Sequence, residues 1–324
     1  MKFMNAIACF SLFAITKTPA LPLEQLTYSE AAQQLIPVSF SQMVPHLRSI
    51  DSKTLPHQVK KPLDLRKEVL KVRDYLDIFA YAMPDAKIKK KTDAYERLRQ
   101  DLDEGYAVLG SYKDLFDMQG TSAQQAAYDK QDVKKRREDL LKWRDQFLAR
   151  EGEYFAYLNS IDGNTLVDRD RSDLSSFYWG ATELRPAAQL SAHENLNFLL
   201  RDLLLQARTE WPLVRQISNP ARDPHNIEVF HDFRKRVRTL VKVTTYFPEL
   251  VRWKPEDLAF LKEITRRYGV ISDQVAKIIL LEDKGKDSKV KKLKDETKDL
   301  WKELQAWEAK YNVEAKLAGL LEYF

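Results

Sequence analysis

Residues 64–69 read Asp-Leu-Arg-Lys-Glu-Val, and residues 232–237 read Asp-Phe-Arg-Lys-Arg-Val. The apolar positions that follow match at the same offset of 168 residues: Leu65, Val69, Val72 and Phe79 correspond to Phe233, Val237, Leu240 and Phe247. Apolar residues three, four and seven positions apart lie on one face of an α-helix. Similarity at a fixed offset is typical of an internal duplication, so the two stretches predict two related helical halves.

A second match lies downstream of the first. Residues 109–114 and residues 268–273 both read apolar-Gly-x-x-x-Asp, at an offset of 159 residues. The nine-residue difference between the two offsets is expected to fall in the loop after the first matched helix of each half. Two matches in the same order predict a bundle of two four-helix repeats with approximate two-fold symmetry. Repeat one is expected at about 61–160 and repeat two at about 191–324.

The rest of the sequence predicts an all-α fold. Apolar residues recur at helical spacing near residues 95–109, 124–158, 196–211, 226–247, 256–281 and 287–311. Only 9 of the 324 residues are glycine and 31% are charged, which argues against collagen-like, disulfide-rich and glycine-loop nucleotide-binding proteins. Residues 162–190 break the pattern and predict a loop with a short element at 177–179. Residues 21–60 contain several prolines and little periodicity, so they predict an N-terminal extension to a helical domain at 61–324.

The first twenty residues have the three parts of a secretory signal peptide. A basic start is followed by an apolar stretch at residues 3–15 and by small residues at 18–20. Cleavage after Ala20 would remove Cys9, the only cysteine, and would lower the net charge from +5 to +3 by removing two lysines. The mature chain would then have no disulfide, thiolate metal site or cysteine nucleophile. Export without disulfides predicts a periplasmic or secreted bacterial protein, and no later stretch is apolar and long enough to span a bilayer.

One predicted helix carries a basic face. On a helical wheel, the residues that surround His231 opposite the apolar stripe are Arg234, Lys235, Arg238 and Lys242. Like charges four residues apart destabilise an isolated helix by a few tenths of a kcal/mol, so a row of cations predicts an anionic partner. Arginine suits phosphate because its planar guanidinium can bind two oxygens at once. The alternative is a solvated face, or one paired with some of the 48 acidic residues.

His231, with an arginine three residues on and basic residues seven and eleven residues on, resembles the motif of the conserved histidine α-helical domain (CHAD) family. The resemblance covers roughly residues 60–324. It implies a fold of two four-helix repeats and the binding of inorganic polyphosphate by basic residues between the repeats. The predicted polyphosphate-binding set is therefore His231, Arg234, Lys235, Arg238 and Lys242 from the second repeat, with Arg66 and Lys67 in register from the first.

The first repeat departs from the family pattern. Leu63 stands at the histidine position, Leu70 at the position of Arg238, and Asp74 at the position of Lys242. This leaves a second hypothesis open, in which the chain is a structural or protein-interaction scaffold that has kept the fold and lost the ligand. Neutralisation of the basic residues by Asp74 and neighbouring acids would favour that scaffold.

Motifs for catalysis are missing from the sequence. There is no glycine-rich phosphate loop and no Gly-x-Ser-x-Gly elbow, and His193-Glu194 is followed by Asn197 where a zinc protease has its second histidine. Residues 168–172 begin like a calcium loop but lack its glycine and its closing glutamate. We therefore predict a non-enzymatic protein without a metal or cofactor. Nucleic acid is a weaker candidate than polyphosphate because no aromatic residues alternate with the basic row.

Overall fold

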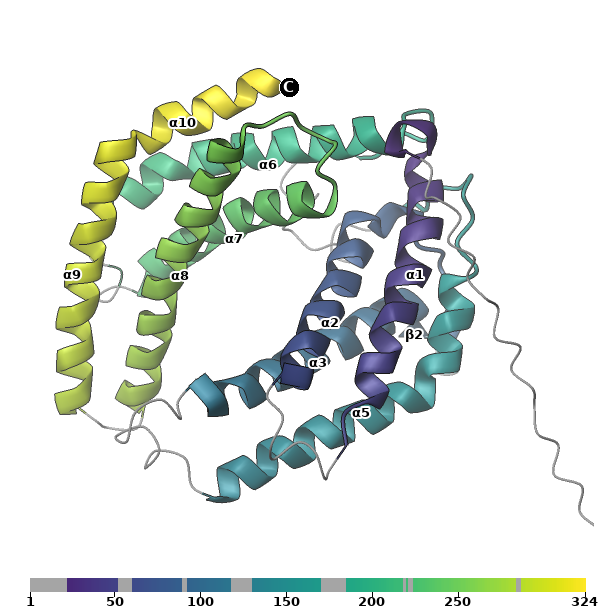
Figure 1. The fold of residues 1–324 in the computed structure, drawn as a ribbon, viewed down its shortest axis with the longest axis horizontal. Coiled ribbons are helices and arrows are strands. Elements are labelled where there is room, and N and C mark those ends of the chain that lie inside the picture. The colour runs from purple at the N-terminus through teal and green to yellow at the C-terminus, as the bar shows by residue number, and fades with distance from the viewer. Residues whose placement is uncertain are drawn as a thin grey trace, which may run out of the picture.

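The computed structural model describes residues 22–51, 60–88, 92–117, 130–169, 185–217, 220, 224–283 and 287–324. In these ranges the chain is helical apart from short connections and one minimal hairpin, so the all-α class is confirmed for this part of the chain (Figure 1). The helices are α1 (Tyr28–Arg48), α2 (Lys60–Ile78), α3 (Ala94–Asp117), α5 (Lys130–Leu158), α6 (Ala192–Arg215), α7 (Pro224–Tyr246), α8 (Pro255–Asp283), α9 (Asp287–Tyr311) and α10 (Val313–Leu320).

Short elements join some of these helices. The 3-10 helices are η1 (Leu23–Gln25), η2 (Ala80–Ala82) and η4 (Leu321–Tyr323). Strands β1 (Lys87–Ile88) and β2 (Thr92–Asp93) form an antiparallel pair before α3. The predicted signal peptide at 1–20 and the predicted short element at 177–179 lie outside the described residues. No helix of the described residues is long and apolar enough to cross a membrane.

The helices pack in two groups that follow the chain. In the first group α1 contacts α2 and α5, and α3 contacts the same two helices. In the second group α6 contacts α7, α7 contacts α8, and α8 contacts α9, while α10 returns to α6. Figure 1 shows the first group in purple to teal and the second in green to yellow, on either side of an open centre.

Helix α1 lies in the segment that the sequence predicts as an N-terminal extension, one that either packs on the domain or trails from it. It occupies most of the range 21–60, which the prolines and weak periodicity had set apart as an extension. Its side chains at Ile36, Phe40 and Met43 are fully buried, so α1 belongs to the core of the first group. The helix starts at a capping box between Thr27 and Glu30, which satisfies backbone N–H groups at its N-terminus. Two prolines lie inside the helix, and because proline is unfavourable in a helix interior, helix propensity does not predict this element.

The matched apolar stripes form the core. Leu65, Val69 and Val72 of α2 are fully buried, and so are Phe233, Val237 and Leu240 of α7. Full burial of one such side chain contributes about 1.5–3 kcal/mol through the hydrophobic effect. The stripe found in the sequence therefore turns α2 and α7 so that their opposite, polar faces are left for solvent or a ligand.

Among the described residues, the two groups meet at the N-terminal ends of α1 and α6 and at the C-terminal ends of α2 and α7. At the first, the N-cap residues Thr27 of α1 and Ser191 of α6 form an isolated antiparallel bridge, and each begins a capping box. At the second, the rings of Phe79 and Phe247, which follow the ends of α2 and α7, lie 6.2 Å apart at right angles. The C-terminal ends of α2 and α7 are thereby held together.

Candidate anion-binding site

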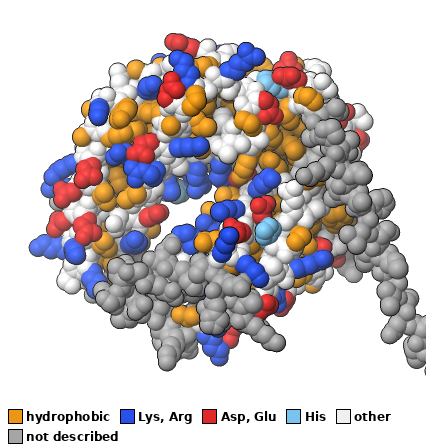
Figure 2. Space-filling model, in the orientation of Figure 1, with side chains coloured by type: hydrophobic (Ala, Val, Ile, Leu, Met, Phe, Trp, Pro, Cys, Tyr) orange, Lys and Arg blue, Asp and Glu red, His pale blue; other side chains and the backbone are white. Residues whose placement is uncertain are grey.

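Basic side chains surround a hollow in the middle of the molecule. Figure 2 shows Lys and Arg on both sides of this hollow, and comparison with Figure 1 places α7 on one side and α2 with α3 on the other. Arg66 of α2 and Arg234 and Arg238 of α7 each have a buried Nε that finds no hydrogen-bond partner among the described residues. Buried polar atoms in native proteins are nearly always paired, so these N–H groups are candidates to bind a ligand.

Two glycines accommodate two of these arginines. A Cβ built at Gly110 of α3 would lie 3.4 Å from Nη2 of Arg66. At Gly269 of α8 the corresponding distance to Nη2 of Arg234 would be 3.1 Å. Glycine inside a helix costs about 1 kcal/mol relative to alanine. The close approach of a guanidinium explains the glycine at 269, whereas an added Cβ at 110 would be at the edge of ordinary van der Waals contact. In both helix groups the contact links the two matched motifs of the sequence in space.

Tyr106 of α3 is a neighbour of both basic helices. The guanidinium of Arg66 lies over its ring at 4.0 Å and that of Arg73 at 4.6 Å. Burial and the nearby Arg238 lower the pKa of Arg234, while Asp273 and Tyr106 oppose this shift. Tyr106 therefore acts on Arg234 from the opposite helix group. Neither Tyr106 nor Arg73 was predicted, although Arg73 lies two helical turns from Arg66 on the same face of α2.

His231 is half-buried beside the arginines. Burial lowers the pKa of its imidazole, and the positive charges of Lys235, Arg234 and Arg238 lower it further. The imidazole is therefore neutral near pH 7 and has one N–H to donate. A bound anion would favour its protonated form.

Lys242 is engaged with an acid. Its Nζ lies 2.9 Å from Oδ2 and 3.0 Å from Oδ1 of Asp74 on α2, and the Asp74 residue is only 2% exposed. The hydroxyl of Tyr246 donates to the same carboxylate at 2.8 Å. Burial lowers the pKa of Lys242, and Asp74 opposes that shift. The basic row predicted from the helical wheel therefore has its last cation paired across the two helix groups.

Asp77, one of the acids that follow Asp74 on α2, faces a different partner. It forms an ion pair of 3.1 Å with Nε of Arg99 on α3. Burial raises the pKa of Asp77 to about 7, although Arg99 and Arg73 lower it. Asp77 thus neutralises Arg99 rather than the basic face of α7.

The two predicted lysines next to the arginines lie at the surface. Lys235 pairs with Asp232 at 3.4 Å, and Lys67 pairs with Asp64 at 3.3 Å. Exposed pairs of this kind contribute less than about 1 kcal/mol, so a phosphate could readily displace the aspartates. Both lysines are therefore held only by weak surface ion pairs.

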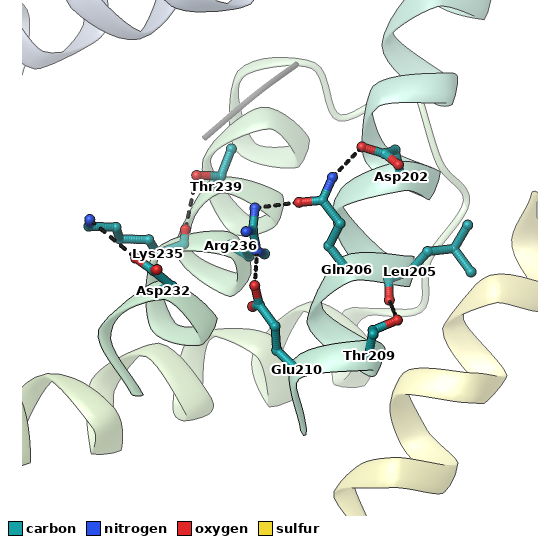
Figure 3. Close-up of polar contacts among 9 residues, drawn as sticks. All are labelled: Asp202, Leu205, Gln206, Thr209, Glu210, Asp232, Lys235, Arg236 and Thr239. Carbon is teal, nitrogen blue, oxygen red and sulfur yellow. Dashed lines mark hydrogen bonds and ion pairs between the residues drawn. The ribbon is translucent and has the colours of Figure 1, made fainter. Parts of the chain in front are cut away.

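Arg236 belongs to the same basic run but points away from the site. Figure 3 shows its guanidinium between Glu210 and Gln206 of α6, and its Nε donates to Glu210 at 2.6 Å. Gln206 in turn donates to Asp202 at 2.6 Å. Arg236 therefore holds α7 on α6, which orients the helix that carries the basic row.

No group of three or more His, Cys, Asp or Glu side chains that could hold a metal ion occurs among the described residues. A scan of the sequence against protein-family models found no match, and searches of curated proteins and of solved structures found none either.

Proposed function

We propose that this protein binds a phosphate-rich polyanion in the hollow between α2 and α7, with inorganic polyphosphate as the ligand that the CHAD resemblance implies. The observation that carries the proposal is the set of buried guanidinium Nε atoms without a hydrogen-bond partner at Arg66, Arg234 and Arg238. They come from both helix groups, and an anion between the groups would satisfy them together. The proposed role is capture without catalysis.

Binding would be electrostatic. The arginines offer paired N–H donors to phosphate oxygens, and His231 adds a donor that becomes positively charged when the anion is bound. Lys235 and Lys67 would exchange their exposed aspartates for phosphate at the rim. Because a polyanion releases condensed counterions when it binds, affinity should fall steeply as salt rises.

We further infer that the two helix groups are repeats related by an approximate two-fold axis, with α1 to α5 as the first and α6 to α9 as the second. Positions that are equivalent under a two-fold axis touch each other where they lie near it. Three contacts support this: Thr27 with Ser191, Asp74 with Lys242, and Phe79 with Phe247. On this proposal the first repeat includes α1 and so begins before residue 61.

Export remains part of the proposal. It rests on the signal-peptide pattern of residues 1–20. The ligand would then be met in the periplasm or outside the cell.

A protein-interaction scaffold is the second candidate function. The pairing of Lys242 with Asp74 favours it, because it reduces the charge of the basic row. Helix α6 also exposes apolar side chains at Phe198, Leu205 and Leu213, which are 45%, 42% and 49% exposed and could contact a partner chain.

A charge-reversal experiment tests the proposed function. The variant Arg234→Glu/Arg238→Glu should lose retention of long-chain inorganic polyphosphate at low salt. The matched control is Arg266→Glu/Lys302→Glu, which reverses two exposed charges on α8 and α9 and changes the net charge equally. The control should still bind. Equal binding by both variants would overturn the site, and absence of binding by the unsubstituted protein would favour the scaffold.

A further inference from the structure

The ion pair between Lys242 and Asp74 stands at one end of the basic row. Along α7 the row runs through His231, Arg234 and Arg238 to Lys242, about one helical turn at a time. Arg238 is close enough to Lys242 to lower its pKa, so the row is electrostatically continuous up to that lysine. Asp74 then meets it from α2, with both carboxylate oxygens within 3.0 Å of Nζ.

Asp74 is built into the fold at this point. The residue is 2% exposed, and Tyr246 of α7 donates a hydrogen bond to it at 2.8 Å. The side chain of Lys242 is 14% exposed, so the pair is shielded from water and from salt. A phosphate chain that extended past Arg238 would meet a lysine whose charge is already matched and a carboxylate that repels it.

We propose that Asp74 is an internal counter-ion that ends the polyanion site at Arg238 and keeps Lys242 out of the set of phosphate ligands. The inference rests on the proposed function. It makes Asp74 a determinant of how many phosphates the site contacts. Asp74 of the first repeat and Lys242 of the second occupy equivalent positions and carry opposite charges. The two charges therefore neutralise each other.

Two variants test this inference by fluorescence anisotropy with labelled long-chain inorganic polyphosphate. Asp74→Asn releases Lys242, so it should bind about fivefold more tightly at low salt, the effect of one unit-charge pair at 4 Å in water. Its log–log salt dependence should be steeper by about 0.7 to 0.9, as for one more released counterion. Asp74→Asn/Lys242→Gln removes the pair as a unit and should return both values to those of the unsubstituted protein.

The matched control is Asp299→Asn on α9. It removes one carboxylate from an exposed ion pair with Lys302 of 3.3 Å, outside the basic row, and should leave the affinity unchanged. Affinity equal to that of the unsubstituted protein in folded Asp74→Asn would overturn the inference. So would weaker binding by Asp74→Asn/Lys242→Gln, because Lys242 would then be a phosphate ligand in the native protein. The double variant keeps the test valid if Asp74→Asn alone fails to fold.

The two proposals fail in different ways. If the unsubstituted protein does not retain polyphosphate at low salt, the proposed function is wrong. If it does, and Arg234→Glu/Arg238→Glu abolishes retention while Asp74→Asn has no effect, only the counter-ion role of Asp74 is wrong. Thermal unfolding of each variant without polyphosphate shows whether it is folded.

Discussion

The guanidinium of Arg234 rests against Gly269, where an added Cβ would lie 3.1 Å from Nη2. Arg66 lies against Gly110 in the same way, at 3.4 Å. In both cases the arginine comes from one helix and the glycine from the next helix of its group. Each guanidinium therefore packs against the glycine of the neighbouring helix. A larger residue at that glycine should shift the arginine without itself contacting the ligand.

We expect Gly269→Ala to weaken polyphosphate binding without lowering the stability of the protein. Alanine is favoured over glycine in a helix by about 1 kcal/mol, so the melting temperature should stay level or rise. The new methyl group displaces Arg234 by a few tenths of an ångström, so polyphosphate affinity should fall a few-fold. Gly152→Ala is the control, because a Cβ there meets nothing within 4 Å. Equal affinity in the two variants would show that Gly269 does not position Arg234.

Gly105→Ala should have the opposite effect on stability. A Cβ at Gly105 would lie 2.1 Å from Cζ2 and 2.4 Å from Cε2 of Trp143. The indole is held by its N–H, which donates to the carbonyl of Asp101 at 2.8 Å, and is 2% exposed. Overpacking of this kind costs about 1–3 kcal/mol or more. Urea unfolding should show this loss, and a stability equal to that of Gly152→Ala would contradict the close packing of α3 on α5.

Because α1 belongs to the core, we expect a large loss of stability when Phe40 is truncated. Phe40 is fully buried and its ring lies 6.0 Å from that of Phe147 on α5. Phe40→Ala should cost about 3–5 kcal/mol of unfolding free energy. Val38, on the same helix, is 40% exposed, and Val38→Ala should stay within about 0.5 kcal/mol. Similar small losses for both variants would indicate that residues 28–48 are an appendage.

A buried acid in the second group predicts pH-dependent stability. Burial raises the pKa of Glu308 to about 7, although the hydrogen bond from Tyr268 and the charge of Arg215 lower it. Between pH 4.5 and about 7 the folded protein keeps a proton that the unfolded chain has lost, so this group's contribution to stability falls as pH rises. Glu308→Gln removes this loss and keeps an acceptor for Tyr268.

The advantage of Glu308→Gln over the unsubstituted protein should therefore grow from pH 4.5 to 7 and then level off. At the plateau the difference in unfolding free energy between the two proteins should be a few kcal/mol. This follows because a tenfold change in proton affinity corresponds to about 1.4 kcal/mol. Chemical unfolding across this range measures it. A difference between the two proteins that does not change with pH would rule out a raised pKa at Glu308.

Polyphosphate binding should depend on pH through His231. Because burial and neighbouring cations lower its pKa in the free protein, a polyanion should make the imidazole take up a proton. Affinity should therefore increase as pH falls through and below the normal histidine range. His231→Gln should flatten this dependence, whereas His46→Gln on the exposed side of α1 should not. A retained pH dependence in His231→Gln would remove this histidine from the site.

Much of the helical fold could be predicted because it depends on local periodicity. The helix expected at 226–247 is found at Pro224–Tyr246, and the one expected at 256–281 is found at Pro255–Asp283. Helix α1 could not be predicted in this way because Pro37 and Pro45 interrupt its pattern, and packing against α2, α5 and α6 stabilises it.

The candidate site was predictable in part. The helical wheel placed Arg234 and Arg238 on one polar face, because the apolar stripe determines which side of α7 is buried. The wheel also placed Lys242 there, but it carries no information on what α2 presents opposite. That contact joins residues 168 positions apart, which is the offset of the repeat. The offset makes the two positions equivalent but does not show that their side chains meet.

The sequence by itself therefore determined the helices, their buried stripes and the basic face of α7, since these follow from the 3.6-residue turn and from the burial of apolar side chains. Only the tertiary structure decided which cations have no acidic partner among the described residues and so can bind a ligand. Coulomb interactions depend on distance in space and on exposure to water, so the partner of Lys242 and the glycine supports of Arg66 and Arg234 exist only once the helices have packed.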